Sequence, residues 1–524
     1  MLTVFASKFL GLIRDRLLVH NFDTAHASIF FAAFNLPDLL FNLLIFGALS
    51  VAFIPVFTEH LHQNGEKEAF LFASNILNLS LVMFGIVCVL AFIFVTPLNS
   101  LFVPGFSGAQ KEATDSLTRV ILVGQLLLVI GSFFVGIAQS YQLFIVPSLA
   151  PLFYNLGIII GTAFLSPSLG IMGPGVGVII GAFLHGLVQF PQIRSLGFRY
   201  KFSFDFFNKG VREVFRLMSV RTIGLAAEQL NDKVGFALAS LVSLSAPTIL
   251  TFAQHLQIVP IGLFGATIAQ AALPVLSREH SRGEKAAFKI TVLTTMHQVL
   301  FLTLPATIFL IVLRIPVVRL VFGAAQFNWN DTVLTGRTLA FLAMGLAAQS
   351  VVLLLVRAFY ALKDTKTPVI VSLTTVSVNV ILSFTFVRIW YWDVWSIGLA
   401  FSISSVLSFF ALFYFLNKKV GGFENEDVYT PALKMLLASM VAALALYIPI
   451  KAFDQVIFDT TRTFNLIFLT GIASIFGIGI YILLVWLLRV KELFVFGELL
   501  KKIYRLQFEV KSSEMIKETT TSVK

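Results

Sequence analysis

The chain has 524 residues, of which 57% are hydrophobic and 12% are charged, and its mean hydropathy is +0.90. Because an ordinary soluble domain carries about 25% charged residues, this composition excludes a soluble globular protein. The formal net charge of +11 is explained by basic loops on one side of a membrane rather than by binding to nucleic acid. The single cysteine, Cys88, lies in an apolar run, so no internal disulfide forms and we expect this thiol to pack in the core.

Long apolar stretches follow one another from end to end, each long enough to cross about 30 Å of hydrocarbon. They predict an all-α integral membrane protein of about 14 transmembrane helices. The predicted helices span residues 3–21, 28–57, 69–97, 116–140, 144–166, 170–193, 214–240, 246–275, 287–313, 333–360, 366–390, 394–417, 431–451 and 464–488.

Basic residues in alternate loops predict the orientation. One set of loops is rich in them: Arg194, Arg199, Lys201, Lys209, Arg212, Arg278, Arg282, Lys285, Arg357, Lys363, Lys366, Lys418 and Lys419. The opposite loops hold fewer: Lys111, Arg314, Arg319, Lys451 and Arg462. By the positive-inside rule both termini and the tail 491–524 are expected to be cytoplasmic. The polar stretch FYALKDTKTP, residues 359–368, is then a cytoplasmic loop whose lysines can contact anionic head groups.

An internal repeat divides the chain. IPVFTEHLHQNGEKEAF (54–70) matches LPVLSREHSRGEKAAF (273–288), and Pro147 matches Pro368, all at an offset of about 220 residues. Six helices per copy return the chain to its starting side, so the two copies are parallel, and transporters built this way bind substrate between their halves. We therefore predict an N-lobe (1–209), a C-lobe (210–420), two appended helices (421–490) and a tail (491–524).

Charged residues at membrane depth are costly and need a function or a partner. The first helix contains Lys8, Arg14 and Asp15, which also distinguishes it from the uncharged core of a signal peptide. Lys8 and Asp15 share a face, and Arg14 lies about 120° from Lys8. These side chains either line a water-filled cavity or form ion pairs with neighbouring helices.

A second polar group lies further along the chain. Arg221, Glu228 and Asp232 share one face of the helix 214–240 and form either a structural ion-pair network or a site that couples transport to a proton or cation. His255 stands between Gln254 and Gln257 and is either a hydrogen-bonded core histidine or part of a polar binding patch.

Signatures of an enzyme are not found in the sequence. No GxxxxGK[ST] motif is present, which argues against an ATP-driven pump, and no histidine, cysteine and aspartate residues have the spacing of a metal site. We expect no cofactor, and a carrier driven by Na⁺, H⁺ or the membrane potential fits best.

Several stretches resemble the MurJ/MviN family of lipid II flippases, within the larger MOP exporter superfamily. They are SKFLGLIRD (7–15), FFAAFNLPDLL (30–40), GALSVAFIPVF (47–57), RTIGLAAEQLN (221–231), PIGLFGATIAQAALPVLS (260–277) and RAFYALKDTKTP (357–368). The resemblance implies transport of undecaprenyl-diphosphate-disaccharide-pentapeptide from the inner to the outer leaflet by alternating access. A diphosphate needs cationic donors, whereas the polyprenyl tail is expected to stay in lipid.

The family's cationic positions match only in part. Arg14 and Asp15 match, Lys8 replaces an arginine, His255 stands at another arginine position, and Phe41 replaces the arginine that follows the LPN motif. The resemblance implies substrate contacts by Lys8, Arg14, Asp15 and His255. It also implies a coupling-ion site, with Glu228, Asp232 and Asn379 as candidates.

Three other functions stay open at this point: a flippase for another undecaprenyl-diphosphate-linked glycan, a small-molecule antiporter of the MOP type, and a degenerate paralogue that acts as a scaffold. The expected partners are lipid II or a related glycan and membrane lipids, without nucleic acid. The oligomeric state is left open, with a monomer as the simplest expectation.

Overall fold

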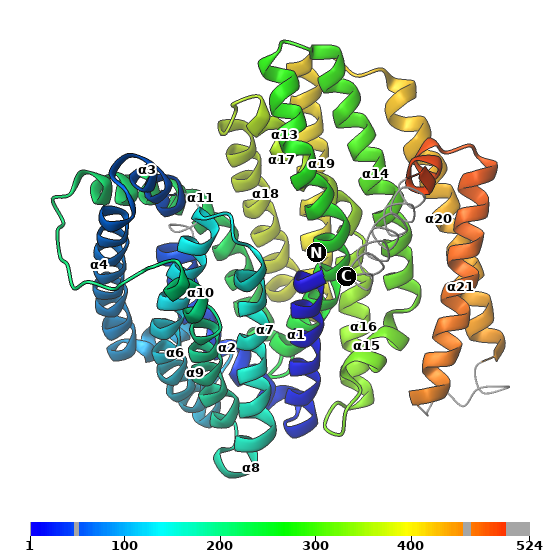
Figure 1. Cartoon of the computed structure of the whole chain (residues 1–524). Helices are drawn as coiled ribbons and strands as arrows, with labels where there is room; N and C mark the ends of the chain where they lie inside the picture. Colours follow the sequence, from blue (N-terminus) through cyan, green and yellow to red (C-terminus); the bar gives the residue numbers. More distant parts are fainter. Residues whose placement is uncertain (1, 47–51, 454–462, 499–524) are drawn as a thin grey trace, which may run out of the picture. The chain divides into compact units, whose positions relative to one another are not determined.

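The computed structural model describes residues 2–46, 52–453 and 463–498, without the side chains of residues 2, 4, 5, 46, 219–228 and 425–427. Almost all of the described chain is helical (Figure 1). The α-helices are α1 (Leu2–Asn21), α2 (Thr24–Phe41), α3 (Ile54–Asn64), α4 (Glu66–Ile93), α5 (Val95–Phe102), α6 (Gly108–Ser140), α7 (Ile145–Ile160), α8 (Ser166–Leu169), α9 (Met172–Leu187), α10 (Phe190–Ser195), α11 (Lys209–Val242), α12 (Ala246–Pro260), α13 (Thr267–Ser281), α14 (Lys285–Val312), α15 (Arg314–Phe322), α16 (Trp329–Ala343), α17 (Leu346–Ala361), α18 (Lys366–Phe384), α19 (Trp395–Val420), α20 (Asn425–Phe453) and α21 (Thr463–Leu487).

The predicted all-α membrane fold is confirmed. Within the described ranges, 11 helices are long and apolar enough to cross a membrane, or 12 if the bent pair α16 and α17 is one span. The other two predicted spans correspond to α1 and α11, which are helical but fall short of this apolar criterion. Charged side chains lower the hydropathy of both helices, and these are the charges that the sequence marks as functional candidates.

The internal repeat has a counterpart in the local backbone. Within the described residues, π-helical segments interrupt the α-helices at η1 (Asn42–Phe46), η3 (Gly161–Leu165), η4 (Ile261–Ala266) and η5 (Thr385–Ile389). The first and third, and likewise the second and fourth, are separated by about 220 residues, the offset of the sequence repeat. π-Helical turns are rare and are found frequently at functional sites, so their recurrence supports duplication of a structural unit.

The repeated Gly-Glu-Lys stretch has a glycine with positive φ in both copies. Gly65, between α3 and α4, has φ +82°, and Gly283, between α13 and α14, has φ +72°. Both glycines therefore adopt the left-handed backbone that other residues rarely take. The sequence match at these two positions preserves a helix-to-helix turn.

The helices fall into two compact units. Unit 1 comprises Met1–Val259, Arg314–Gly345 and Lys366–Ser408, and unit 2 comprises Pro260–Leu313, Leu346–Thr365 and Phe409–Lys524. These boundaries are not those of the lobes expected from the repeat, 1–209 and 210–420, and the division into lobes stays a prediction. In unit 2 the appended helices α20 and α21 pack on α14, where the Tyr481 hydroxyl donates to the carbonyl of Phe301 at 2.8 Å.

Glycines bring α7 and α9 into close contact in unit 1. A Cβ atom on Gly157 would lie 2.2 Å from the Cα of Gly181, and one on Gly161 would lie 2.4 Å from the Cα of Gly177. Small residues four apart allow two membrane helices to approach backbone to backbone. This contact fixes α7, which contributes to the candidate site.

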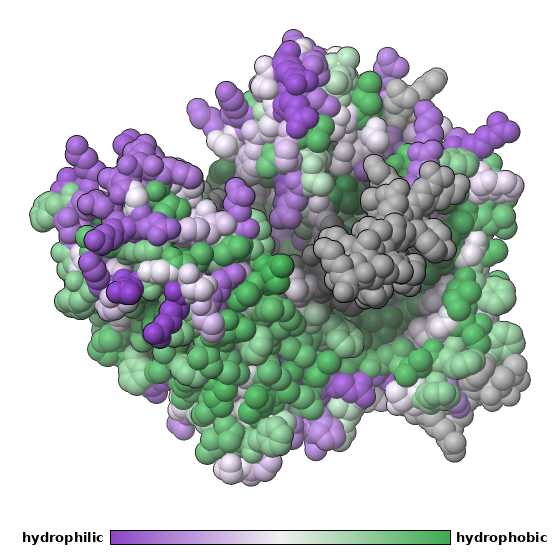
Figure 2. Space-filling model, viewed as in Figure 1, coloured by the Kyte–Doolittle hydropathy of each residue, from purple (hydrophilic) through white to green (hydrophobic). Residues whose placement is uncertain are grey.

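The outer surface of unit 1 suits contact with lipid. Figure 2 shows hydrophobic residues over α4, α6 and α9, and hydrophilic residues at the end of the unit where α3 lies. Val82, Ile86 and Val89 of α4 have between 46% and 59% of their surface exposed. Apolar side chains exposed along a helix of this length are expected where lipid, rather than water, is the solvent.

Candidate functional site

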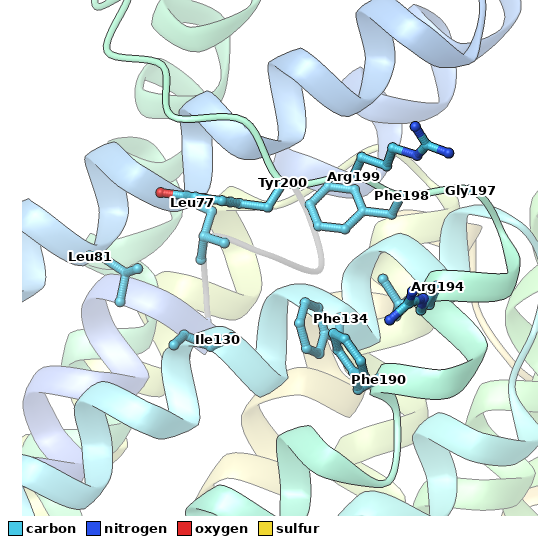
Figure 3. Close-up of a pocket in the computed structure, with 11 residues that line it drawn as sticks. Leu77, Leu81, Ile130, Phe134, Phe190, Arg194, Gly197, Phe198, Arg199 and Tyr200 are labelled. Atoms are coloured by element: carbon cyan, nitrogen blue, oxygen red, sulfur yellow. The ribbon is translucent and has the colours of Figure 1, made fainter.

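Unit 1 contains a cavity of about 770 Å³ between α4, α6, α10 and the loop that follows α10 (Figure 3). Its lining is mainly apolar, and Lys8, Arg14, Asp15 and His255 are not part of it. The predicted substrate-binding residues therefore lie at a different place in unit 1.

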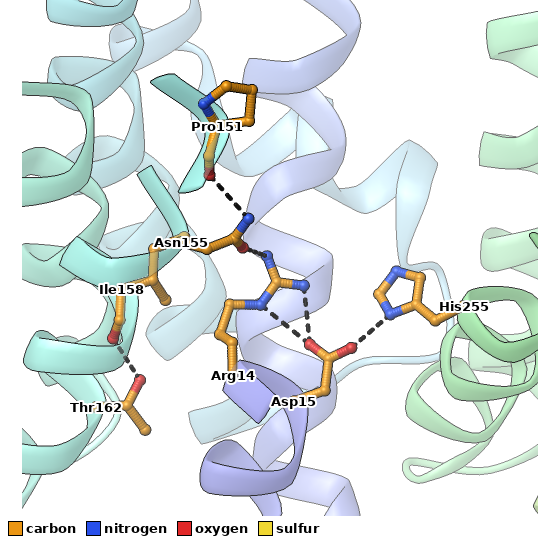
Figure 4. A network of polar contacts seen from close by, with 7 residues as sticks. All are labelled: Arg14, Asp15, Pro151, Asn155, Ile158, Thr162 and His255. Atoms are coloured by element: carbon orange, nitrogen blue, oxygen red, sulfur yellow. Dashed lines mark hydrogen bonds and ion pairs between the residues drawn. The ribbon is translucent and has the colours of Figure 1, made fainter. Parts of the chain in front are cut away.

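Asp15 is the centre of a polar network that joins α1 to α12 (Figure 4). Arg14 donates to Oδ1 of Asp15 from Nε at 3.0 Å and from Nη2 at 2.8 Å. The other carboxylate oxygen, Oδ2, lies 2.6 Å from Nδ1 of His255. Asp15 has no exposed surface, so its charge is balanced by Arg14 and, when protonated, by His255.

Asn155 of α7 orients the arginine. Its Oδ1 accepts a hydrogen bond from Nη1 of Arg14 at 3.2 Å, and its Nδ2 donates to the carbonyl of Pro151 at 3.0 Å (Figure 4). Among the described residues the guanidinium thus uses three of its five N–H donors, and two form no hydrogen bond there. Arg14 keeps 17% of its side chain exposed.

Lys8 lies two turns before Asp15 on the same helix and is partly buried. Among the described residues it has no hydrogen bond or ion pair.

Sequence reasoning missed Asp38, which adds a second carboxylate. Asp38 of α2 accepts from Nε2 of Gln125 at 2.9 Å and interacts electrostatically with Lys233 of α11 and with Arg14. An aspartate within the apolar segment FNLPDLLF was the signal that could have identified it. We call Arg14, Asp15, Asp38, Lys233 and His255 the α1 cluster.

Phe41 is a core residue. It is 7% exposed, and its ring centroid lies 6.2 Å from that of Phe84 in an edge-on contact. The position at which the family resemblance implies an arginine therefore contributes hydrophobic packing between α2 and α4 in this chain.

The coupling-ion candidates are only partly brought together. Nδ2 of the buried Asn379 on α18 donates to Oδ1 of Asn231 on α11 at 2.8 Å, and Asp232 follows as an exposed residue. The side chain of Glu228 lies outside the described part of the chain. The amide pair links α11 to α18 at the place where the sequence predicts an ion site.

The chain matches a known protein family over most of its length. The family model described as "Lipid II flippase MurJ" matches residues 22–467. Among relatives named "Probable lipid II flippase MurJ", that of Bdellovibrio bacteriovorus is 28% identical over 90% of this chain and 91% of its own length. That of Vibrio cholerae is 30% identical over 78% of this chain and 79% of its own length.

Solved structures agree with the fold. The structure titled "Lipid II flippase MurJ, inward closed conformation" superposes with a TM-score of 0.78 at 25% identity, over 92% of this chain and 97% of that chain. A multidrug resistance MATE transporter of the MOP superfamily superposes with a TM-score of 0.66 at 15% identity, over 79% of this chain and 94% of that chain, and supports the fold alone. The family match over residues 22–467, most of the chain, means that this chain belongs to the MurJ family of lipid II flippases.

Proposed function

We propose that this chain is a lipid II flippase, a transporter and not an enzyme, that moves undecaprenyl-diphosphate-disaccharide-pentapeptide from the inner to the outer leaflet. Membership of the MurJ family over residues 22–467 is the observation that carries this proposal. The transport cycle is alternating access between the two repeat-derived lobes, 1–209 and 210–420, with substrate bound between them.

Arg14 and Lys8 bind the diphosphate. A guanidinium with two unused donors and a nearby ammonium suit phosphate oxygens, because hydrogen bonds between ionised partners are about twice as strong as neutral ones. Asp15, His255 and Asn155 hold the guanidinium in place. Asp15 and His255 act as positioning residues.

The polyprenyl tail is too long to enclose and remains in lipid beside α20 and α21. The protein is a multi-pass protein of the bacterial cytoplasmic membrane with both termini in the cytoplasm, as the distribution of Lys and Arg among the loops supports. Na⁺ or H⁺ binding near Asp232, Asn379 and Glu228, or the membrane potential, supplies the energy. A monomer suffices for this mechanism.

A second candidate is transport of another undecaprenyl-diphosphate-linked glycan. The observation that favours it is the packing of Phe41 in the core, which removes one of the cations that the family resemblance implies. Both substrates share the diphosphate, so the α1 cluster serves either one.

Complementation of a bacterium depleted of its own lipid II flippase tests the proposal. We expect the wild-type chain to restore growth, Arg14→Ala to fail, and Arg14→Lys to restore growth weakly, because lysine keeps the charge but not the fork of donors. Arg16→Gln is the matched control. This substitution removes a cation of the same helix that is not in the α1 cluster. Arg16 donates to the carbonyl of Leu320 at 2.6 Å. We expect the Arg16→Gln variant to restore growth.

Two outcomes contradict the proposal. If the wild-type chain is inserted in the membrane and does not restore growth, lipid II is not its substrate and the other glycans become the leading candidates. If Arg14→Ala restores growth as well as the wild type at equal expression, Arg14 does not bind the diphosphate.

A further inference from the structure

We propose that the cavity in Figure 3 binds an anionic phospholipid of the surrounding membrane, at a site separate from the α1 cluster. The phosphate of the lipid contacts Arg194 and Arg199, and the upper parts of its acyl chains lie against Leu77, Leu81 and Ile130.

The cavity is amphipathic. Figure 3 shows Leu77, Leu81 and Ile130 on one side of the cavity, whereas Arg194 and Arg199 lie on the opposite side, on either side of the loop that carries Phe198. Its volume of about 770 Å³ is within the range of about 300–1,000 Å³ that is usual for ligand sites. This is enough for a headgroup, its glycerol backbone and the first methylene groups of two acyl chains.

The loop 199–206, of which Arg199 and Tyr200 line the cavity, is fixed to α4 by hydrogen bonds. Asn75 Nδ2 donates to the carbonyl of Asp205 at 2.7 Å, and Asn75 Oδ1 accepts from the amide of Asp205 at 2.8 Å. Asn78 Nδ2 donates to the carbonyl of Ser203 at 3.0 Å, and its Oδ1 accepts from the Tyr200 hydroxyl at 2.7 Å. These asparagines are 3% and 4% exposed, so the apolar helix α4 buries polar groups in order to hold this loop.

The two arginines are available to a ligand. Arg194 and Arg199 are exposed, and neither forms an ion pair with a carboxylate in the described part of the chain. A guanidinium binds phosphate oxygens through two parallel hydrogen bonds. Two such groups on the rim of an apolar cavity therefore favour a phosphate that carries apolar chains over a free phosphate ion.

The surroundings of the cavity identify the source of that phosphate as the bilayer. The loop beyond the cavity exposes Phe202, Phe204, Phe206 and Phe207, with between 49% and 80% of each residue accessible. Exposed apolar rings of this kind can bury themselves at the boundary between head groups and acyl chains, as those of interfacial segments do. α4 continues from Leu81 with exposed Val82 and Ile86, which provide an apolar surface for the remainder of the acyl chains.

Native mass spectrometry of the purified full-length chain, titrated with phosphatidylglycerol, tests the proposal. We expect Arg194→Gln/Arg199→Gln to weaken binding of the first lipid at least tenfold, and Ile130→Trp, which fills the apolar end, to weaken it at least threefold. Arg278→Gln/Arg282→Gln is the matched control, because it removes two exposed arginines from an equally short segment outside this cavity. Its affinity should stay within twofold of the wild type.

Two further binding measurements distinguish an anionic phospholipid from other phosphate-containing ligands. Phosphatidylcholine should bind more weakly than phosphatidylglycerol, and inorganic phosphate should not compete with it at equal concentration. Unchanged phosphatidylglycerol binding by the Arg194/Arg199 variant, or an equal loss in the control, would overturn the site. Competition by inorganic phosphate alone would overturn the assignment to a lipid. Unaltered thermal unfolding of each variant shows that loss of binding is not loss of fold.

Discussion

Asp15 accounts for much of the organisation of the α1 cluster, because one buried carboxylate receives Arg14 from its own helix and His255 from α12. The charges of Lys8, Arg14 and Asp15 could be predicted to matter, since ionisable groups at membrane depth need a partner or a function. The partners of these charges could not be predicted from the sequence. Asn155 is 141 residues from Arg14, and His255 is 240 residues from Asp15, so these contacts depend on how the helices pack.

The pairing of Arg14 with Asp15 leads to a prediction of non-additivity. Asp15→Asn leaves a half-buried guanidinium without its counter-ion and should destabilise the protein by about 3 kcal/mol. Arg14→Gln in the same chain removes the uncompensated charge, so the double variant should be more stable than Asp15→Asn alone. Denaturant unfolding in detergent of the wild type, both single variants and the double variant measures the coupling, which we expect to be about 0.5–3 kcal/mol. Additive effects would show that the two side chains do not interact.

At the scale of the helices, run length and charge patterning predicted which segments are helical, including the two charged ones, α1 and α11. The π-helical segments could not be predicted, because a change in backbone hydrogen-bond register leaves no mark in hydrophobic periodicity. The loop after α10 was predicted only as a basic connection. Its attachment to Asn75 and Asn78 follows from side chains that, in a sequence, are simply polar residues in an apolar helix.

Close packing of α7 on α9 predicts opposite effects for one substitution at two glycines. Gly157→Ala places a methyl group 2.2 Å from backbone atoms of Gly181, which must separate the helices and should destabilise the protein by about 1–3 kcal/mol. Gly85→Ala in α4 meets no atom within 4 Å and should stabilise it by about 0.5–1 kcal/mol, because alanine loses less backbone entropy in a helix. The thermal unfolding temperatures of the two variants, each compared with the wild type, test this prediction. A Gly157→Ala variant that is as stable as the wild type or more stable would mean that α7 and α9 do not approach so closely.

For the whole molecule, the number of crossings depends on whether α11 spans the membrane despite its charges. Ala109 opens α6 and Ser281 closes α13, and both are exposed. The chain between them forms five predicted crossings, by α6, α7, α9, α11 and the α12–α13 segment. An odd number places the two positions on opposite sides, with Ala109 outside and Ser281 in the cytoplasm, whereas a peripheral α11 would place them on the same side.

Single-cysteine labelling tests this topology, because the only native cysteine, Cys88, is buried and can be replaced by alanine. In that background we expect Ala109→Cys to react with a membrane-impermeant maleimide added to intact cells, and Ser281→Cys to react only after the membrane is opened. The Cys88→Ala chain without added cysteine gives the background signal. Labelling of both positions from outside would show that α11 does not cross the membrane. It would also contradict the parallel arrangement of two six-helix copies. Labelling of Ser281→Cys alone would keep the five crossings but reverse the orientation, which would place the basic loops outside and contradict their electrostatic role at the anionic cytoplasmic surface.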